Sequence, residues 1–141
     1  MLKINIFFMV EITTLLFLIG RILVGAFYIF NGIGHFARYK QMVEYAKSKG
    51  VIYPKLLVPL TGILLIFGGL SIITGFLYVY GILALLIFLV PTTIIMHNFW
   101  SIKNEQIKII EMVNFMKNLA LIGSLLMFLA IPSPWEFSLS F

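Results

Sequence analysis

The most restrictive feature of this sequence is a long stretch without charge: no Asp, Glu, Lys or Arg lies between Lys55 and Lys103. A membrane-spanning helix needs about 20 apolar residues to cross about 30 Å of hydrocarbon. The stretch is too long for one such helix and long enough for two. Glycines and tyrosines near its middle indicate a turn at the membrane surface. The sequence therefore predicts two consecutive membrane-spanning helices, over residues 56–76 and 79–100.

Two further apolar stretches have spanning length. Residues 13–36 form the first, although Arg21 interrupts it. An arginine at the centre of a helix opposes insertion by about 2.5–3.5 kcal/mol, which a long apolar segment offsets. Residues 115–131 form the second, and Pro132 ends it because proline cannot continue a helix. The sequence thus predicts four spans.

The composition excludes a soluble monomer. Hydrophobic residues make up 62% of the 141 residues and charged residues 11%, whereas soluble domains average about 45–50% and about 25%. A domain of about 150 residues buries only about 70% of its unfolded surface, so this chain would leave much apolar surface in water. We therefore expect residues 1–141 to form a single all-α membrane domain, an antiparallel four-transmembrane-helix bundle.

Short interfacial helices are expected in the two connectors that carry charge. In the first connector, Tyr39, Met42, Val43 and Ala46 recur at the spacing of one helix face, which is typical of a helix lying in the membrane surface. The second connector, over residues 103–117, mixes isoleucines with charged residues and is expected to behave in the same way. Solvated loops are the alternative for both connectors.

The basic residues of the connectors predict the orientation in the membrane. They are Arg38, Lys40, Lys47, Lys49, Lys55, Lys103, Lys108 and Lys117. Four spans put both connectors on one side, which the positive-inside rule makes cytoplasmic, with both termini outside. The excess of basic residues in the connectors also accounts for the net charge of +5, so nucleic acid is not expected as a partner. We expect a multi-pass protein of the plasma membrane, in contact with the lipid bilayer.

Polar residues within the spans and at their ends are candidates for a functional site, because ionisable groups in a membrane usually face a bundle interior or a water-filled cavity. His35 and His97 end the first and third helices, which run in the same direction, so both are expected at one end of the bundle. Arg21 has two interpretations, a buried functional role or snorkelling to the near interface. The candidate ligand-binding residues are Arg21, Asn31, His35, His97, Trp100, Lys117 and Asn118.

This polar cap leaves three interpretations open. Two histidines could ligate a haem or share a metal ion. Imidazole, amide and lysine groups could bind a quinone, with Phe99 and Trp100 stacking on its ring. The residues could also only cap the bundle. Two isolated histidines are a weak signal for haem, and we expect no metal site and no intrinsic cofactor.

The chain contains no cysteine, which excludes a thiolate nucleophile and Cys-ligated iron–sulfur clusters. No nucleophilic, phosphate-binding or dinucleotide-binding motif occurs, since the glycine pair at Gly32 and Gly34 lacks a third glycine at the required spacing. The sequence therefore identifies no catalytic residue.

Four segments carry a resemblance to a known family. They are RILVGAFYIFNG at residues 21–32, the glycine pair at 68–69, MHNFW at 96–100 and MKNLAL at 116–121. In this order, and over nearly the whole chain, they resemble the DoxX family of small four-helix membrane proteins. The His-x-Phe-Trp and Lys-Asn-Leu-Ala-Leu elements are the most specific parts.

The resemblance implies a four-helix bundle with Arg21, His97, Lys117 and Asn118 at the family's recurring polar positions. Family members are linked to sulfur respiration and terminal oxidases, and a related branch resembles the membrane subunit of a thiosulfate:quinone oxidoreductase. This chain departs from the family in two ways. Many members carry a Glu shortly before the glycine pair, where residues 63–67 are apolar here, and cysteine-bearing relatives use thiol chemistry that this chain lacks.

These observations lead to three hypotheses for the function. The first is a small membrane subunit of a larger quinone-linked respiratory or sulfur-oxidising oxidoreductase, mainly structural, with a quinone-adjacent polar site. The alternative is a quinone-reducing catalytic subunit, in which His97 and Lys117 bind the quinone and a partner supplies electrons. The third is transport of a small solute, which the few polar residues of the second helix disfavour. We do not expect the chain to be catalytic alone.

Overall fold

The computed structural model describes residues 2–139, which form a helical protein. Its elements are α1 (Leu2–Ala37), α2 (Tyr39–Ser48), α3 (Pro54–Thr74), α4 (Tyr78–Met96), the short 3-10 helix η1 (Phe99–Ser101) and α5 (Glu105–Ala130). Four segments are long and apolar enough to cross a membrane: Met9–Ala37, Pro54–Thr74, Tyr78–Ser101 and Glu105–Ala130. The predicted all-α membrane fold with four spans is confirmed.

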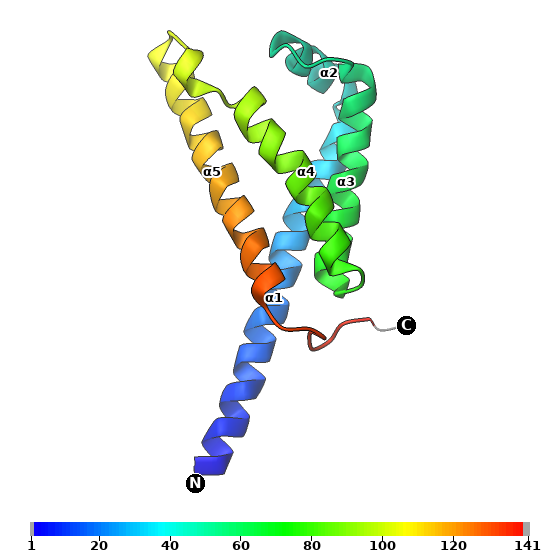
Figure 1. Cartoon of the computed structure of the whole chain (residues 1–141), viewed down its shortest axis with the longest axis vertical. Helices are drawn as coiled ribbons and strands as arrows, with labels where there is room; N and C mark the ends of the chain where they lie inside the picture. The colour runs from blue at the N-terminus through cyan, green and yellow to red at the C-terminus, as the bar shows by residue number, and fades with distance from the viewer. Residues whose placement is uncertain (1, 140–141) are drawn as a thin grey trace.

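The first connector contains the expected amphipathic helix. The apolar face of α2 buries Val43 and Ala46 against Val58 of α3, and Met96 at the end of α4 packs against the same cluster. The charged side chains of α2 lie on its other faces. Figure 1 shows α2 lying across one end of the long helices, as a helix in the membrane surface would.

The second connector differs from the expectation. Instead of a separate interfacial helix over residues 103–117, one continuous helix runs from Glu105 to Ala130. It begins there because the side chain of Asn104 accepts a hydrogen bond from the backbone N–H of Ile107 at 3.1 Å, which caps the helix. No proline or glycine follows until Gly123, so nothing interrupts the helix before the apolar stretch begins.

Helix α1 is also longer than expected, since it begins at Leu2 rather than near residue 13. Its 36 residues correspond to about 54 Å at a rise of about 1.5 Å per residue. Figure 1 shows its N-terminal part extending beyond the other helices at the end opposite α2.

Glycines allow α1 and α3 to pack closely along their length. A Cβ atom added to Gly32 would lie 2.8 Å from the carbonyl oxygen of Gly62, and one added to Gly69 would lie 2.6 Å from the carbonyl oxygen of Gly25. Both distances are shorter than a side chain tolerates. Small residues at such contacts let helix backbones approach in a membrane, where packing replaces the hydrophobic effect as the source of stability.

The end of the bundle opposite α2 is closed by the segment that follows α5. Trp135 is buried there, and its ring packs at 4.1 Å from the ring of Tyr78 and at 5.3 Å from that of Phe17. The backbone N–H of Leu139 donates to the carbonyl of Thr74 at the end of α3, at 2.9 Å. Trp135 belongs to the main apolar core, which also includes Leu125.

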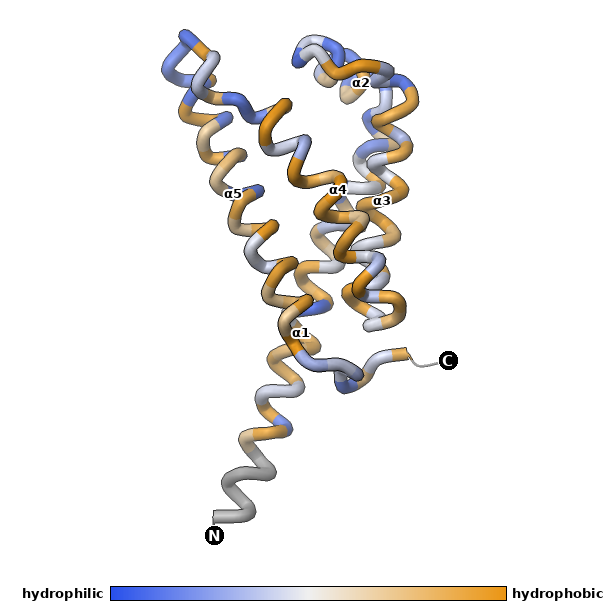
Figure 2. The backbone as a smooth tube through the Cα atoms, in the orientation of Figure 1, coloured by the Kyte–Doolittle hydropathy of each residue, from blue (hydrophilic) through white to orange (hydrophobic). Residues whose placement is uncertain are grey.

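The other end of the bundle is more open. In Figure 1, α3 and α4 lie close together at the turn that joins them and diverge toward the α2 end. Figure 2 shows that the hydrophilic residues gather around α2 and this connector, whereas the middle of the helices is mainly hydrophobic. The polar residues predicted from the sequence are therefore concentrated where the helices separate.

Candidate functional site

Two adjoining hollows lie at the α2 end of the bundle. The apolar cavity, of about 360 Å³, is bounded by α2, α3 and α4, with walls that include Met42, Ala46, Leu57, Leu64, Ile87 and Met96. The polar pocket, of about 120 Å³, is bounded mainly by α1, α4 and α5, with walls that include Tyr28, Asn31, Lys117 and Asn118. Both hollows are lined by His35, Phe88, Thr92 and His97.

Five of the seven residues predicted from the sequence line the polar pocket together. They are Asn31, His35, His97, Lys117 and Asn118. Helix α1 provides the first two, α4 ends at His97, and α5 provides the last two. The expectation that both histidines lie at one end of the bundle agrees with this arrangement, and the other lining residues are apolar or aromatic except Thr92.

Tyr28 is the most unusual residue of the polar pocket. It is 1% exposed, and its hydroxyl is the buried side-chain polar atom among the described residues that has no hydrogen-bond partner. Burying a hydroxyl without a partner typically opposes folding by about 1–3 kcal/mol. A buried, unpartnered donor in the wall of a pocket indicates a place for a ligand or water oxygen.

Two further donors of the polar pocket are free to bind a ligand. Asn118 as a residue is 4% exposed, and its side-chain amide makes no hydrogen bond to the described part of the chain. The Nζ of Lys117 donates to the Oδ1 of Asn114 at 3.2 Å and forms no ion pair with a described carboxylate. Asn31 is exposed and donates to the carbonyl of Phe27 at 2.7 Å. The pocket is thus rich in donors and carries an uncompensated positive charge.

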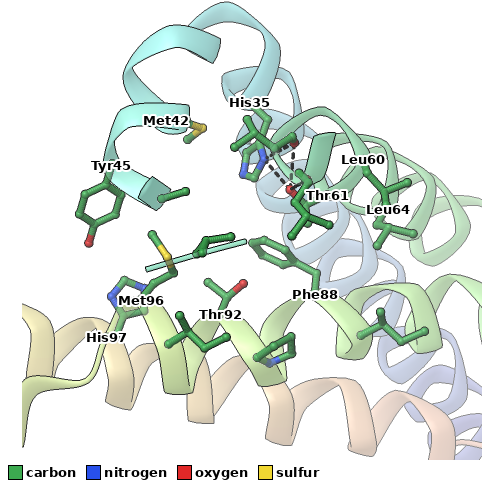
Figure 3. A pocket seen from close by; sticks show the side chains of 17 residues that line it. His35, Met42, Tyr45, Leu60, Thr61, Leu64, Phe88, Thr92, Met96 and His97 are labelled. Carbon is green, nitrogen blue, oxygen red and sulfur yellow. Dashed lines mark hydrogen bonds between the residues drawn. The ribbon is translucent and has the colours of Figure 1, made fainter. Parts of the chain in front are cut away.

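His35 is held by α3. Its Nδ1 lies 3.0 Å from the carbonyl oxygen of Val58 and 3.0 Å from the Oγ1 of Thr61. The ring also packs edge-on against Phe88, with centroids 5.7 Å apart. Figure 3 shows His35 and Thr61 on one side of the apolar cavity, with Met96 and His97 across from them. The fixed ring places His35 in the wall between the two hollows.

Glu111 of α5 is buried and is the centre of a hydrogen-bond network. Its Oε2 lies 2.7 Å from the Nδ1 of His97, and its Oε1 accepts from the Nζ of Lys49 at 3.0 Å. The hydroxyl of Tyr45 donates to the same Oε1 at 3.0 Å. These bonds join α2, the end of α4 and α5. Charge-assisted hydrogen bonds of this kind are stronger than neutral ones, so Glu111 holds the three elements together beside the hollows.

The same network changes the acidity of Tyr45, which lies in α2 outside the spans. Partial burial, the hydrogen bond to Glu111 and the negative charge of that carboxylate together raise the pKa of Tyr45 to about 12. Each factor disfavours the phenolate. Tyr45 therefore remains a hydrogen-bond donor throughout the physiological pH range.

Arg21 does not belong to this site. Fourteen positions of α1 separate it from His35, or about 21 Å of helix. Its guanidinium donates to the carbonyls of Ile72 and Ile73 at 3.0 and 2.7 Å, and to that of Glu136 at 2.7 Å. The side chain is 0% exposed, so it does not snorkel. It caps the C-terminal end of α3, where helix carbonyls lack partners and a cation is favourable.

Trp100 also lies outside the hollows. It is exposed, and its ring contacts Phe99 and Phe115 at centroid distances of 5.3 and 5.7 Å. Trp100 therefore does not provide the expected stacking surface for a ring in the polar pocket. Phe27 and Phe88 line the pocket instead.

Sequence reasoning did not select Tyr28, Tyr45 or Lys49 as site residues. Tyr28 had a signal, because it lies seven positions before His35 on the same face of α1. Tyr45 and Lys49 had none, since their contact with Glu111 depends on how α2 packs across the end of the bundle. Among residues 2–139, no group of three or more His, Asp or Glu side chains is placed to hold a metal ion.

Comparison with known proteins supports the resemblance seen in the sequence. The family model for DoxX matches residues 16–98, which is more than half of the chain and includes two of the four segments that carry the resemblance in full and the first three residues of the third. No curated protein and no solved structure matches the chain. The matched region contains Tyr28, both site histidines and the glycine contacts between α1 and α3. The chain belongs to the DoxX family.

Proposed function

We propose that this protein is a quinone-binding membrane subunit of a larger oxidoreductase complex. The observation that carries the proposal is the junction of the donor-rich polar pocket with the apolar cavity. A quinone has a flat head with two carbonyl oxygens and a long apolar tail. Ligand sites of this kind combine a few placed polar groups with mainly apolar walls, and the two hollows offer both.

The residues present fit a quinone head group. The hydroxyl of Tyr28 and the amide of Asn118 are donors without a described partner, and a carbonyl oxygen is an acceptor. The rings of Phe27 and Phe88 provide flat apolar surface in the same pocket. The tail would occupy the apolar cavity beneath α2. When bound, the quinone would supply two-electron redox chemistry, while this chain would bind and orient it.

The electrons would come from a partner subunit, because the side chains around the hollows are not redox centres. Membership of the DoxX family supports an association with an oxidoreductase complex. The proposal is thus a binding and assembly role in which the complex, rather than this chain alone, performs the reaction.

We also propose that the α2 end faces the cytoplasm of a plasma-membrane protein. Seven of the eight basic residues lie in or next to α2 and around the start of α5, and Lys117 lies further along α5. The positive-inside rule then puts both termini outside. The polar pocket would lie near the cytoplasmic surface.

Quinone binding tests the site directly. The purified chain in detergent is titrated with decylubiquinone, and the Tyr28→Phe variant is expected to bind it about fivefold or more weakly because one hydrogen bond is lost. Tyr80→Phe is the matched control, since Tyr80 is 65% exposed at the opposite end of α4. Absence of binding by the unmodified chain, or equal loss in both variants, would contradict the proposed site.

The partner is tested separately by native gel electrophoresis of membranes dissolved in a mild detergent. The chain is expected to migrate in a complex that also contains a redox-active subunit, identified by mass spectrometry. Recovery of the free chain alone would exclude the subunit role even if the chain binds a quinone.

A further inference from the structure

We infer that the polar pocket prefers the hydroquinone form over the quinone, and that Glu111 sets this preference by fixing the tautomer of His97. This inference rests on the proposed function and concerns the selectivity of the same site. It follows from which nitrogen of each histidine carries a proton, which the hydrogen-bond partners determine.

His35 provides the first step. A carbonyl oxygen can only accept a hydrogen bond, so the contact of 3.0 Å between Nδ1 of His35 and the carbonyl of Val58 requires a proton on Nδ1. In a neutral imidazole the other nitrogen is then an acceptor. The Nε2 of His35 makes no hydrogen bond to the described residues, while its ring lines both hollows.

His97 is also protonated at Nδ1, but its hydrogen-bond partner is a carboxylate rather than a carbonyl. Glu111 accepts hydrogen bonds from Lys49 and Tyr45 on Oε1 and contacts the Nδ1 of His97 at 2.7 Å through Oε2. An ionised carboxylate has no proton to donate, so Nδ1 of His97 must carry the proton. In the neutral form of the ring, Nε2 is then also an acceptor, and it too lacks a hydrogen-bond partner among the described residues.

Two imidazole acceptors thus line the hollows beside the donors Tyr28 and Asn118. A quinone oxygen can accept from the donors but has nothing to donate to an imidazole. Each hydroxyl of a hydroquinone can accept from a donor and also donate to Nε2 of a histidine. Since an unsatisfied buried polar group opposes binding, the hydroquinone is expected to bind about tenfold more tightly than the quinone.

The network around Glu111 offers an isosteric test. In Glu111→Gln, the side-chain oxygen can keep Lys49 and Tyr45 as donors, which turns the amide NH₂ toward His97. The amide then donates to Nδ1, so the proton of His97 moves to Nε2 and that nitrogen becomes a donor. This variant is expected to bind decylubiquinol several-fold more weakly and decylubiquinone several-fold more tightly.

The experiment measures the dissociation constants of decylubiquinone and decylubiquinol for the purified full chain under anaerobic conditions. Glu105→Gln is the matched control, because Glu105 is an exposed carboxylate in the first turn of α5 that pairs with Lys108. For this control, the dissociation constant of decylubiquinone divided by that of decylubiquinol is expected to equal the value of the unmodified chain. In Glu111→Gln the same ratio is expected to fall about tenfold.

Nitrogen NMR of the histidine rings provides a second, ligand-independent measurement. Both histidines of the unmodified chain are expected to be protonated at Nδ1, and His97 of Glu111→Gln at Nε2. An Nε2-protonated His97 in the unmodified chain, or a ratio that is unchanged in Glu111→Gln, would overturn the inference. If the variant does not fold, the tautomers and the binding ratio of the unmodified chain decide it. Failure of both ligands to bind would instead reject the proposed function.

Discussion

Arg21 illustrates how a full charge is kept inside a membrane helix without a carboxylate partner among residues 2–139. Its guanidinium satisfies three backbone carbonyls, two of them at the C-terminal end of α3. The rings of Phe17 and Trp135 lie 5.7 and 5.2 Å from its central carbon, close enough for cation–π attraction. At this position, a side chain that the sequence marks as functional has a structural role: it joins α1, α3 and the C-terminal segment.

Replacement of Arg21 by Leu is expected to lower the free energy of unfolding by about 2–4 kcal/mol, because buried carbonyls lose a charged donor. Arg21→Lys should recover part of this loss, since an ammonium group keeps the charge but lacks the flat guanidinium geometry. Unfolding in mixed detergent micelles, followed by circular dichroism, measures both changes. The control is Arg38→Leu at an exposed site, and a similar loss there would contradict this role.

Tyr45 gives a pH-dependent prediction. Burial and Glu111 raise the pKa of Tyr45 to about 12. The hydrogen bond from Tyr45 to Glu111 should therefore contribute fully to the free energy of unfolding below about pH 10, the ordinary pKa of tyrosine. The contribution is lost as the pH rises through the raised pKa. Titration of tyrosinate absorbance, with the Tyr45→Phe spectrum subtracted, should show one transition near 12. Glu111→Gln should move it lower, and an unmoved transition would show that Glu111 is not its cause.

At the scale of elements, the contact between α1 and α3 depends on the absence of side chains. Gly32 faces the carbonyl of Gly62, and Gly69 faces that of Gly25. The contacts are backbone against backbone, so neither helix can relax by turning a rotamer. Helix α5 has no comparable glycine contact, because a Cβ atom added to Gly123 meets nothing within 4 Å. This difference agrees with the divergence of α5 from α1 toward the α2 end (Figure 1).

Gly32→Ala is therefore expected to lower the free energy of unfolding by about 1–3 kcal/mol, as overpacking generally does. Gly20→Ala is the matched control in the same helix, because a Cβ atom there also meets nothing within 4 Å. It should be neutral or stabilising by up to about 1 kcal/mol through helix propensity. Equal stability of the two variants in mixed micelles would show that α1 and α3 do not meet at these glycines.

At the scale of the whole molecule, polarity is distributed unevenly. The basic connectors, the Glu111 network and both hollows lie at the α2 end, whereas the opposite end is closed by aromatic rings around Arg21. Figure 2 shows the hydrophilic residues gathered at the α2 end. A ligand entering the polar pocket would therefore approach from this end or through the lipid.

Single-cysteine labelling tests the proposed orientation, and the chain has no cysteine of its own to interfere. Ser48→Cys, at the exposed end of α2, is expected to react with an impermeant maleimide only after cells are opened. Glu136→Cys, exposed in the C-terminal segment, should react in intact cells. The reverse pattern would place the basic connectors outside and contradict the proposal.

Much of the fold could be predicted from local sequence because its causes are local. A charge-free stretch between Lys55 and Lys103 must lie in lipid, and a helix satisfies its own backbone there. The sequence predicts a later start for α5, because hydropathy shows where the apolar part of a helix begins. The helix itself begins at its cap, which here is Asn104. Glu111, which the sequence places in the connector within reach of the polar cap, lies in α5 instead.

The sequence by itself determined the number of spans, the end that carries the basic residues and the shared end of His35 and His97. These features follow from the hydrophobicity of each segment and from the alternating direction of consecutive helices, both of which can be read from residues near one another in the chain. Only the tertiary structure decided which polar groups meet. Arg21 bonds to carbonyls about 50 and 115 positions away, and α2 brings Lys49 and Tyr45 to Glu111. Such contacts depend on crossing angles and helix ends, which arise from side-chain packing between segments distant in the chain.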